Sequence, residues 1–218
     1  STESVWNLEN SNCNLVISSN LTEDNNLLSL PIKKASRENS GLIVIDPREI
    51  DLTRYAKIWI RPQPGTETLI LNAINKIIFD EAIENSKNVP MDNLREFKNY
   101  LWNFDINKIE QITQVSKDIL YESARLIAKS NKTSFIFGDD VIEDSDTENY
   151  VNSIINLAIT TDNVNGLGKG IYPTFYGLAT SNFYQIASLK KSEIVTTKEI
   201  FEKIDKGQIK ALILFGDG

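Results

Sequence analysis

Two polar segments directly follow apolar runs and could bind a ligand. The first is Asp46-Pro47-Arg48, in which Asp46 closes the apolar run 42–46. A carboxylate at the end of a parallel strand can accept hydrogen bonds from ribose hydroxyls, or from the N–H groups of guanine. An aspartate before proline is equally typical of a turn or of a helix N-cap. We therefore treat Asp46 and Arg48 as candidate nucleotide-binding residues.

The second segment, Gly65-Thr66-Glu67, opens a helical pattern after the apolar run 57–61. Gly65 would let a ligand approach the backbone, Thr66 can cap the helix, and Glu67 complements the helix dipole. The Glu67 carboxylate could equally accept hydrogen bonds from the N1 and N2 hydrogens of guanine. The local pattern alone favours the capping interpretation.

A polar turn and a glycine-rich loop offer two further candidate sites. The turn after run 14–18 contains Asn20 and Glu23, and its hydroxyls and amides could face a phosphate. Gly168 and Gly170 lie in a later loop, where glycine allows close approach to a phosphate or a ring system. A loop of this kind is also an ordinary connection. Neither segment carries the GxGxxG pattern typical of nicotinamide binding.

The composition excludes several classes of site. The chain has 218 residues, no histidine, one cysteine and a formal net charge of −7. Without histidine there is no Ser–His–Asp or Cys–His catalytic group, and one cysteine cannot form an intrachain disulfide or hold an iron–sulfur cluster. The acidic balance argues against nucleic-acid binding, and no apolar run approaches the roughly 20 residues of a membrane span. We therefore expect no catalytic residues and no metal ligands in this chain.

Short apolar runs alternate with longer amphipathic patterns along the chain. Near-continuous apolar runs are typical of strands buried on both faces of a parallel sheet, and apolar residues spaced three or four apart are typical of helices. The patterns predict strands at 14–18, 42–46, 57–61, 133–138 and 210–216, and helices at 27–35, 66–79, 94–102, 117–128, 148–160 and 197–206. This order predicts an α/β, Rossmann-like fold, in which a mostly parallel sheet carries helices on both faces in three layers.

We expect residues 1–218 to form a single Rossmann-like domain. The sequence begins at Ser1 rather than Met, and it stops at Gly218, directly after a predicted strand. In a parallel sheet, a binding loop usually follows such a strand. We therefore expect the chain to be a fragment of a larger multidomain subunit.

The order of these motifs resembles that of the molybdopterin oxidoreductase family. LIVIDPRE followed by PGTETLILNAI resembles the family's DPR … PGT(D/E) block, and VISSNLTEDN resembles its GxNxTE turn. The segment INLAITTDNVNGLGKGIYP resembles NLAxxTGNxGxxGxGxxP, and IKALILFGDG resembles IKALxxxGxN. The family includes formate dehydrogenases, nitrate reductases and the large iron–sulfur subunit of respiratory complex I.

The resemblance implies a role for this segment. In the family it is a Rossmann-like domain that contacts one guanine dinucleotide of a bis-pterin molybdenum or tungsten cofactor. The iron–sulfur clusters and the metal ligand belong to segments upstream of it. Carried over by position, Asn20 and Glu23 would lie near the dinucleotide phosphates. The other implied cofactor-binding residues are Asp46, Arg48, Gly65, Thr66 and Glu67 toward guanine and ribose, and Gly168 and Gly170 along the pterin-side channel.

Several positions depart from the family pattern. Ser18, Asp140 and Asp162 stand where the family prefers glycine, and the Asn-x-Gln-Gly signature expected after Pro173 is shifted. A side chain at such a position competes with the ligand for space. The departures favour the large subunit of an NADH dehydrogenase, in which this domain contributes to electron transfer as a scaffold. The alternatives are a formate dehydrogenase-type domain that binds molybdopterin guanine dinucleotide, a free-standing nucleotide-binding module, and a cofactor-free interaction domain.

The resemblance also implies a setting for the parent protein. The fragment alone would catalyse nothing, whereas the parent would be an oxidoreductase with iron–sulfur clusters in its upstream domains. The expected partners are other domains of the same subunit and other subunits of a redox complex, not nucleic acid. We expect a cytoplasmic protein, peripheral to the inner membrane as part of a complex and without direct membrane insertion.

Overall fold

The computed structural model describes residues 5–86, 89–138, 141, 146–174 and 197–211 of the chain. The backbone forms two compact units, residues 1–176 and 177–218. The first unit contains the sheet and most of the helices, and the described helix of the second unit is α10 (Thr197–Asp205). The expectation of a single domain over residues 1–218 stays a prediction.

The first unit is built on a five-stranded sheet in which every neighbouring pair is parallel. Its order is β3-β2-β1-β4-β5, and Leu15 of the central strand pairs with Ile43 on one side and Phe135 on the other. This order places a topological switch point between β1 and β4, as in Rossmann-like folds, so the predicted fold class is confirmed. The strands are β1 (Cys13–Ile17), β2 (Gly41–Ile45), β3 (Ile58–Ile60), β4 (Thr133–Phe137) and β5 (Gly170–Pro173).

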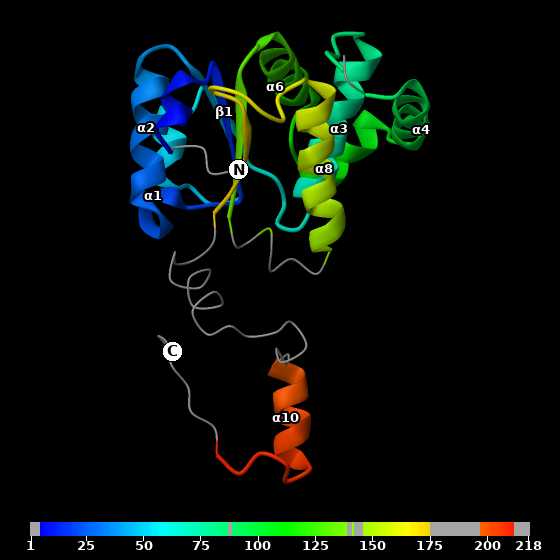
Figure 1. Cartoon of the computed structure of the whole chain (residues 1–218). Helices are drawn as coiled ribbons and strands as arrows, with labels where there is room; N and C mark the ends of the chain where they lie inside the picture. The colour runs from blue at the N-terminus through cyan, green and yellow to red at the C-terminus, as the bar shows by residue number, and fades with distance from the viewer. Residues whose placement is uncertain (1–4, 87–88, 139–140, 142–145, 175–196, 212–218) are drawn as a thin grey trace. The chain divides into compact units, whose positions relative to one another are not determined.

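One face of the sheet is covered by short N-terminal helices (Figure 1). Val16, Val44 and Ile136 of three adjacent strands are fully buried on this face, because alternate strand residues point to opposite sides. Leu8 and Ile32 pack into the same cluster. The elements of this layer are η1 (Val5–Asn10), α1 (Leu21–Asp24), α2 (Asn26–Arg37) and η2 (Asp51–Tyr55).

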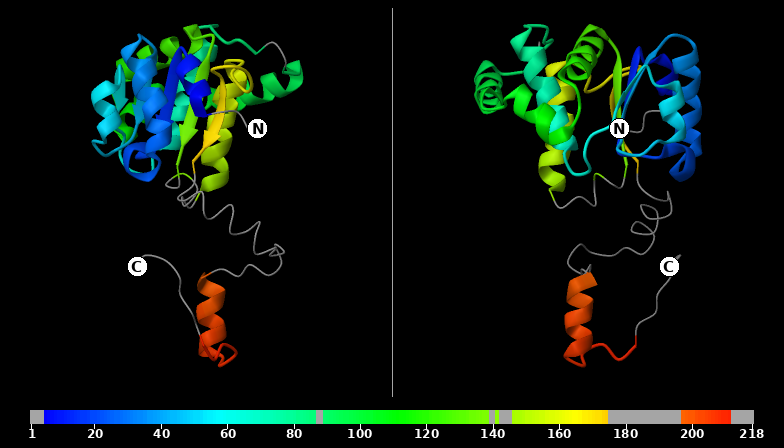
Figure 2. Two further views of the ribbon diagram at one scale, coloured as in Figure 1. Left: turned by 60° about the vertical axis from the view of Figure 1, so that its left-hand side comes forward. Right: turned by 180° about the vertical axis from the view of Figure 1, so that it is seen from behind.

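The opposite face carries longer helices, and the views from the front and from behind agree on this division (Figures 1 and 2). Leu15, Ile43 and Phe135 form the larger core with them. The helices that cover this face are α3 (Glu67–Asp80), α6 (Lys117–Lys129) and α8 (Thr147–Thr160). Two further helices, α4 (Met91–Trp102) and α5 (Ile106–Thr113), pack against α3. The first unit therefore has the predicted three layers, with α4 and α5 as two further helices packed against α3.

Local sequence explains where several helices begin. The Ser116 side chain accepts a hydrogen bond from the backbone N–H of Asp118 at 3.2 Å and so caps α6. Asp105 caps α5 in the same way, because its Oδ1 accepts from the N–H of Asn107 at 2.9 Å. These bonds satisfy N–H groups that have no partner inside the helix.

Some elements differ from those predicted. The structure adds η1, α1, η2 and α5, and it forms strand β5 inside the stretch that the sequence indicated as a glycine-rich loop. β5 has four residues and is only partly buried at the sheet edge, so it lacks the apolar run of a central strand. Of the predicted strand 210–216, residues 212–216 lie outside the described residues.

Candidate functional site

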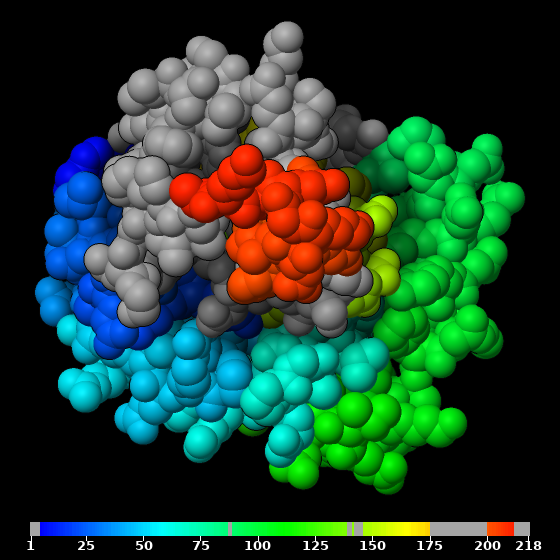
Figure 3. Space-filling view, turned by 90° about the horizontal axis from the view of Figure 1, so that it is seen from below, coloured from blue at the N-terminus to red at the C-terminus, as the bar shows by residue number. Residues whose placement is uncertain are grey.

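Most of the predicted binding residues lie where the strands end. The loops after β1, β2 and β3 carry Asn20, Asp46 and Gly65 respectively, and parallel strands direct all such loops to one edge of the sheet. Figure 3 shows the molecule from below Figure 1, toward this carboxyl edge, with α1 and the loops after β2 and β3 on its blue-to-cyan rim. α1 contacts η2, where Thr22 Oγ1 donates to Asp51 Oδ2 at 3.5 Å.

Asp46 is a fully buried carboxylate at the end of β2. Its Oδ1 accepts hydrogen bonds from the backbone N–H of Arg48 at 2.8 Å and from Arg48 Nε at 3.1 Å, and its Oδ2 accepts from Arg48 Nη2 at 3.2 Å. The Asp46 carbonyl accepts from Trp59 Nε1 at 2.9 Å. The Arg48 side chain is 54% exposed. The carboxylate is therefore fixed in place, while the guanidinium that contacts it lies partly in solvent.

The switch point between β1 and β4 is crowded by small hydroxyl residues. Ser18 adopts a left-handed φ of 42°, and its Oγ lies 2.8 Å from the hydroxyl of Tyr150 in α8. Ser19 Oγ lies 3.4 Å from Thr174 Oγ1. A Cβ at Gly138 would come within 2.7 Å of Ser19 Oγ, so glycine is needed there for the two loops to meet.

The turn that contains Asn20 and Glu23 forms the short helix α1. The Asn20 carbonyl accepts from the N–H groups of Glu23 and Asp24, both at 2.9 Å, and the Asn20 side chain makes no capping hydrogen bond. Glu23 is exposed. Lys33 binds Asp51 at 2.7 Å and lowers the pKa of that carboxyl through its hydrogen bond. α1 is therefore anchored beside the loop that carries Asp46.

The segment from Gly65 to Glu67 begins α3. Gly65 has a φ of 81°, and nothing lies within 4 Å of the position a Cβ would take. Thr66 stands at the N-cap, yet its Oγ1 donates to the carbonyl of Gln63 at 2.6 Å and makes no capping bond, so the predicted side-chain cap is wrong. Glu67 is buried in the first turn of the helix.

Gly168 and Gly170 lie at the other edge of the sheet. Gly170 is the first residue of β5, and a Cβ at Gly168 would collide with the backbone carbonyl of Asn10, just before β1. The structure therefore does not bring these glycines together with Asp46. Close packing against the chain itself accounts for Gly168, and a ligand-binding role for this pair stays a prediction.

The residues that sequence reasoning missed are those joined by contacts across the fold. Tyr150, Ser19 and Thr174 reach the switch point from α8 and from the ends of β1 and β5. Gly138 was visible as the glycine that ends the fourth apolar run. Nothing in the local sequence around Tyr150 indicated its partner, which lies 132 residues away.

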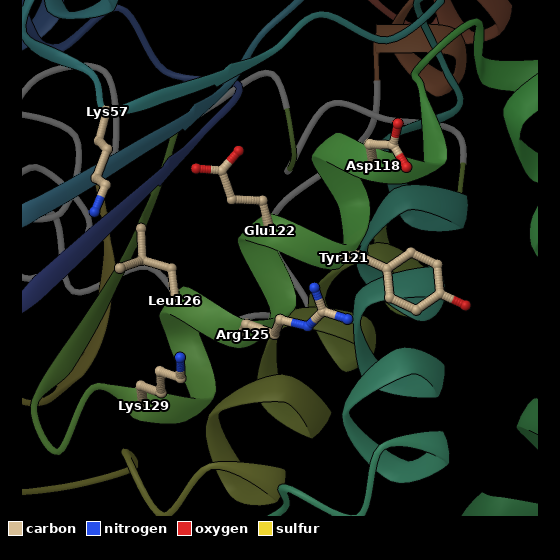
Figure 4. A pocket seen from close by; sticks show the side chains of 7 residues that line it. All are labelled: Lys57, Asp118, Tyr121, Glu122, Arg125, Leu126 and Lys129. Atoms are coloured by element: carbon tan, nitrogen blue, oxygen red, sulfur yellow. The ribbon is translucent and has the colours of Figure 1, made fainter.

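A hollow of about 530 Å³ lies between Lys57 and one side of α6 (Figure 4). Its lining includes Arg125, whose Nε donates to Glu81 Oε2 at 2.9 Å. That hydrogen bond lowers the pKa of Glu81 and raises the pKa of Arg125. Because this guanidinium already has a partner, and because no predicted site residue lines the hollow, we do not assign the site here.

Within the described ranges, no three histidine, cysteine, aspartate or glutamate residues gather as metal ligands would. Among the helices described, none combines the length and apolar character needed to cross a bilayer.

Comparisons with known proteins identify the family. The family model described as "Molybdopterin oxidoreductase" matches residues 1–217. The NADPH-Fe(3+) oxidoreductase subunit alpha of Geobacter sulfurreducens is 28% identical over 209 residues, which cover 85% of this chain and 25% of that protein. The F420-dependent formate dehydrogenase 1 subunit alpha of Methanococcus maripaludis is 25% identical over 174 residues, covering 79% of this chain and 26% of that protein.

Two further similarities point the same way. Formate dehydrogenase H of Escherichia coli is 24% identical over 168 residues, covering 76% of this chain and 24% of that protein. The fold resembles acetylene hydratase from Pelobacter acetylenicus with a TM-score of 0.67 at 20% identity, over 75% of this chain and 25% of that one. The chain thus spans about a quarter of the length of these relatives. Its match to the family model over almost every residue shows that this chain belongs to the molybdopterin oxidoreductase family.

Proposed function

We propose that this chain helps to bind the guanine dinucleotide end of a molybdopterin cofactor in a parent oxidoreductase of the formate dehydrogenase type. Two of the relatives above are named formate dehydrogenases, and both match more than two thirds of this chain. These relatives favour the formate dehydrogenase alternative over the NADH dehydrogenase assignment that the sequence first suggested.

The observation that carries the proposal is the buried carboxylate of Asp46. It lies at the carboxyl end of β2, one strand from the switch point, which is where open α/β sheets bind nucleotides. A carboxylate has two oxygens that only accept hydrogen bonds, which suits the N1–H and N2–H donors of guanine or two ribose hydroxyls. Arg48 supplies equivalent donors in the ligand-free chain, and its side chain is 54% exposed.

The residues at this edge fit a dinucleotide. Ser18 replaces a family glycine, but its side chain is held by Tyr150 of α8 at 2.8 Å and does not have to occupy a ligand position. Asp162 lies at the opposite, amino edge, where it adopts the left-handed φ of 54° that the replaced glycine would have, directly after α8. The departure at Ser18 is thus compatible with a ligand at the carboxyl edge, which supports a retained cofactor over a cofactor-free scaffold. Asp140 and residues 175–196 lie outside the described residues.

In the proposed role this chain binds and orients, and it performs no chemical step. When bound, the metal–pterin part of the cofactor supplies the redox chemistry of the parent. Asp46 would hold the guanine base, and the loops at Asn20 and Gly65 would flank it. Iron–sulfur clusters would belong to other segments of the parent. Because the relatives are named alpha subunits, we also propose that the parent docks against further subunits of a redox complex.

Calorimetric titration of the chain with GDP tests this function. We expect saturable binding of GDP and little binding of CDP, because the cytosine edge lacks the paired N1–H and N2–H donors of guanine. Asp46→Asn replaces one acceptor oxygen by a donor and should weaken GDP binding at least tenfold. Asp118→Asn, at an exposed position on α6, is the matched control and should leave binding unchanged.

Two outcomes would count against the proposal. A titration with GDP that gives no heat of binding, in a chain whose circular dichroism shows it to be folded, would leave only the scaffold role. If GDP bound wild type and Asp46→Asn with equal affinity, Asp46 would not be part of the GDP-binding site, wherever that site lies.

A further inference from the structure

A groove of about 480 Å³ lies between α4 and α8, away from the carboxyl-edge residues. α3 lies between these two helices in the view of Figure 1 and contacts both, and its Asn72 also lines the groove. One wall is a face of α8 that presents Asn149, Asn152 and Asn156, spaced three and four residues apart. The groove is thus lined chiefly by neutral side-chain amides, in a chain region to which the cofactor role assigns nothing.

One amide of the groove, that of Asn72, is almost completely enclosed. Asn72 is 4% exposed, and its side chain makes no hydrogen bond with any residue the structure describes. Asn152 is exposed and Asn156 is half-buried, and neither side chain forms a hydrogen bond within the described ranges. Buried polar groups are normally satisfied, so the Asn72 amide has bonding capacity for a polar ligand, which would replace water at the two more exposed amides.

The spacing of the amides matches an extended polypeptide. With about 1.5 Å of rise per residue, Asn152 and Asn156 are about 6 Å apart along α8. Alternate residues of an extended chain repeat at about 6.6 Å. A side-chain amide carries both a donor and an acceptor, so each can bond the C=O and the N–H of one residue of an extended segment, which point to the same side. The run from Asn149 to Asn156 is about 10 Å long, which is the length of three extended residues.

The opposite wall sets the charge of the ligand. α4 contributes the rings of Phe97 and Tyr100 and the carboxylate of Glu96, and none of the described residues that line the groove is a lysine or an arginine. The whole chain carries a net charge of −7. An aliphatic stem with a cationic end can lie across an aromatic ring and reach a carboxylate. We propose that this groove binds an extended segment of a partner protein that carries a lysine or arginine side chain.

Nuclear magnetic resonance with a defined peptide tests the proposal. The probe is the blocked peptide Ala-Lys-Ala-Lys-Ala, titrated into isotope-labelled chain. We expect saturable shifts of the side-chain amide signals of Asn72, Asn152 and Asn156, and at least fivefold weaker binding of Ala-Glu-Ala-Glu-Ala. The absence of saturable shifts at millimolar peptide would overturn the proposal. Equal binding of the acidic peptide, or the same shifts with maltotriose in place of peptide, would overturn it too.

Variants separate the groove from the rest of the surface. Asn152→Ala changes an exposed residue that makes no contact needed for folding, and it should weaken the lysine peptide about fivefold. Glu96→Gln should remove the preference for the lysine peptide over the acidic one. Asn107→Ala, on an exposed face of α5, is the matched control and should bind as wild type does. Unchanged affinity in Asn152→Ala, or equal loss in Asn107→Ala, would refute the site; GDP binding should be the same in all three variants.

Discussion

The two edges of the parallel sheet use glycine and polar residues in opposite ways. At the amino edge, Gly168 packs directly against the carbonyl of Asn10, and the side chain of Asn163 is fully buried. Asn163 Oδ1 accepts from the N–H of Thr133 at 2.9 Å, and its Nδ2 donates to the carbonyl of Thr161 at 2.8 Å. At the carboxyl edge, Gly65 faces open space, and the buried Asp46 is paired with an exposed arginine.

The difference separates structural from ligand-binding polar groups. A side chain whose partners are backbone atoms of its own core cannot release them without disturbing the fold. The Asp46 carboxylate accepts from one backbone N–H, but its other donors belong to a partly exposed side chain, and a ligand's donors could take their place. The amino edge is therefore expected to respond to mutation with lost stability. The carboxyl edge is expected to respond with lost binding.

Gly168→Ala should have the largest effect on stability. The added Cβ collides with the Asn10 carbonyl, which is backbone and cannot rotate away, and the residue has a left-handed φ of 76°. We expect the free energy of unfolding to fall by about 3 kcal/mol or more, as for other overpacked sites with a strained backbone. Urea denaturation of wild type and variant measures this change in the free energy of unfolding. A loss below about 1 kcal/mol would mean that the two loops at the amino edge are not packed as described.

Cys13, also at the amino edge, should make stability depend on alkaline pH. Burial raises the pKa of its thiol to about 12 from an ordinary 9.0, with a smaller opposing effect from Lys57. The folded state therefore keeps the proton that the unfolded state loses. The stabilisation is complete below pH 9 and is lost as the pH rises toward about 12. At about pH 10.5 we expect a loss of about 2 kcal/mol.

The Cys13→Ala variant isolates this effect, because tyrosines and lysines titrate alike in both proteins. The measurement is the difference in free energy of unfolding between wild type and variant, taken at pH 8 and again near pH 10.5. A difference that does not change with pH would show that the thiol is accessible to water. Rapid reaction of the native thiol with a maleimide would lead to the same conclusion.

Gly65→Ala is the matched substitution at the carboxyl edge. Its φ of 81° disfavours any side chain, but no atom lies within 4 Å of the added Cβ. The strain of a positive φ at a non-glycine residue is then the only cost. We expect the free energy of unfolding, measured by urea denaturation, to fall by about 1 kcal/mol. If Gly65→Ala destabilised the chain as much as Gly168→Ala, the comparison between the two edges would fail.

These edges also show what the sequence can and cannot predict. The buried strands and α3, α6 and α8 were predictable because their apolar residues repeat with the period of the element, as at Ile70, Ile74 and Ile77. The position of Asp46 at the end of β2 was predictable because the residue directly follows such an apolar run, whereas its binding role stays a proposal. The position of Gly168 at the amino edge was not predictable, because a glycine-rich sequence does not indicate which edge of a sheet it lies at. β5 was not recognised because the strand is short and only partly buried.

Ser18→Gly should have the smallest effect, and it tests how the carboxyl edge accommodates a departure from its family. Glycine relieves the left-handed φ of 42°, which favours the variant by about 1 kcal/mol. It also removes the hydrogen bond between Ser18 and Tyr150, which opposes this by a similar amount. We expect the free energy of unfolding to change by less than about 0.5 kcal/mol.

Tyr150→Phe removes only the hydroxyl and should lower the free energy of unfolding by about 1 kcal/mol, which separates the two contributions. A marked destabilisation in Ser18→Gly would show that the hydrogen bond outweighs backbone strain, and that this serine is held for the fold rather than tolerated beside a ligand.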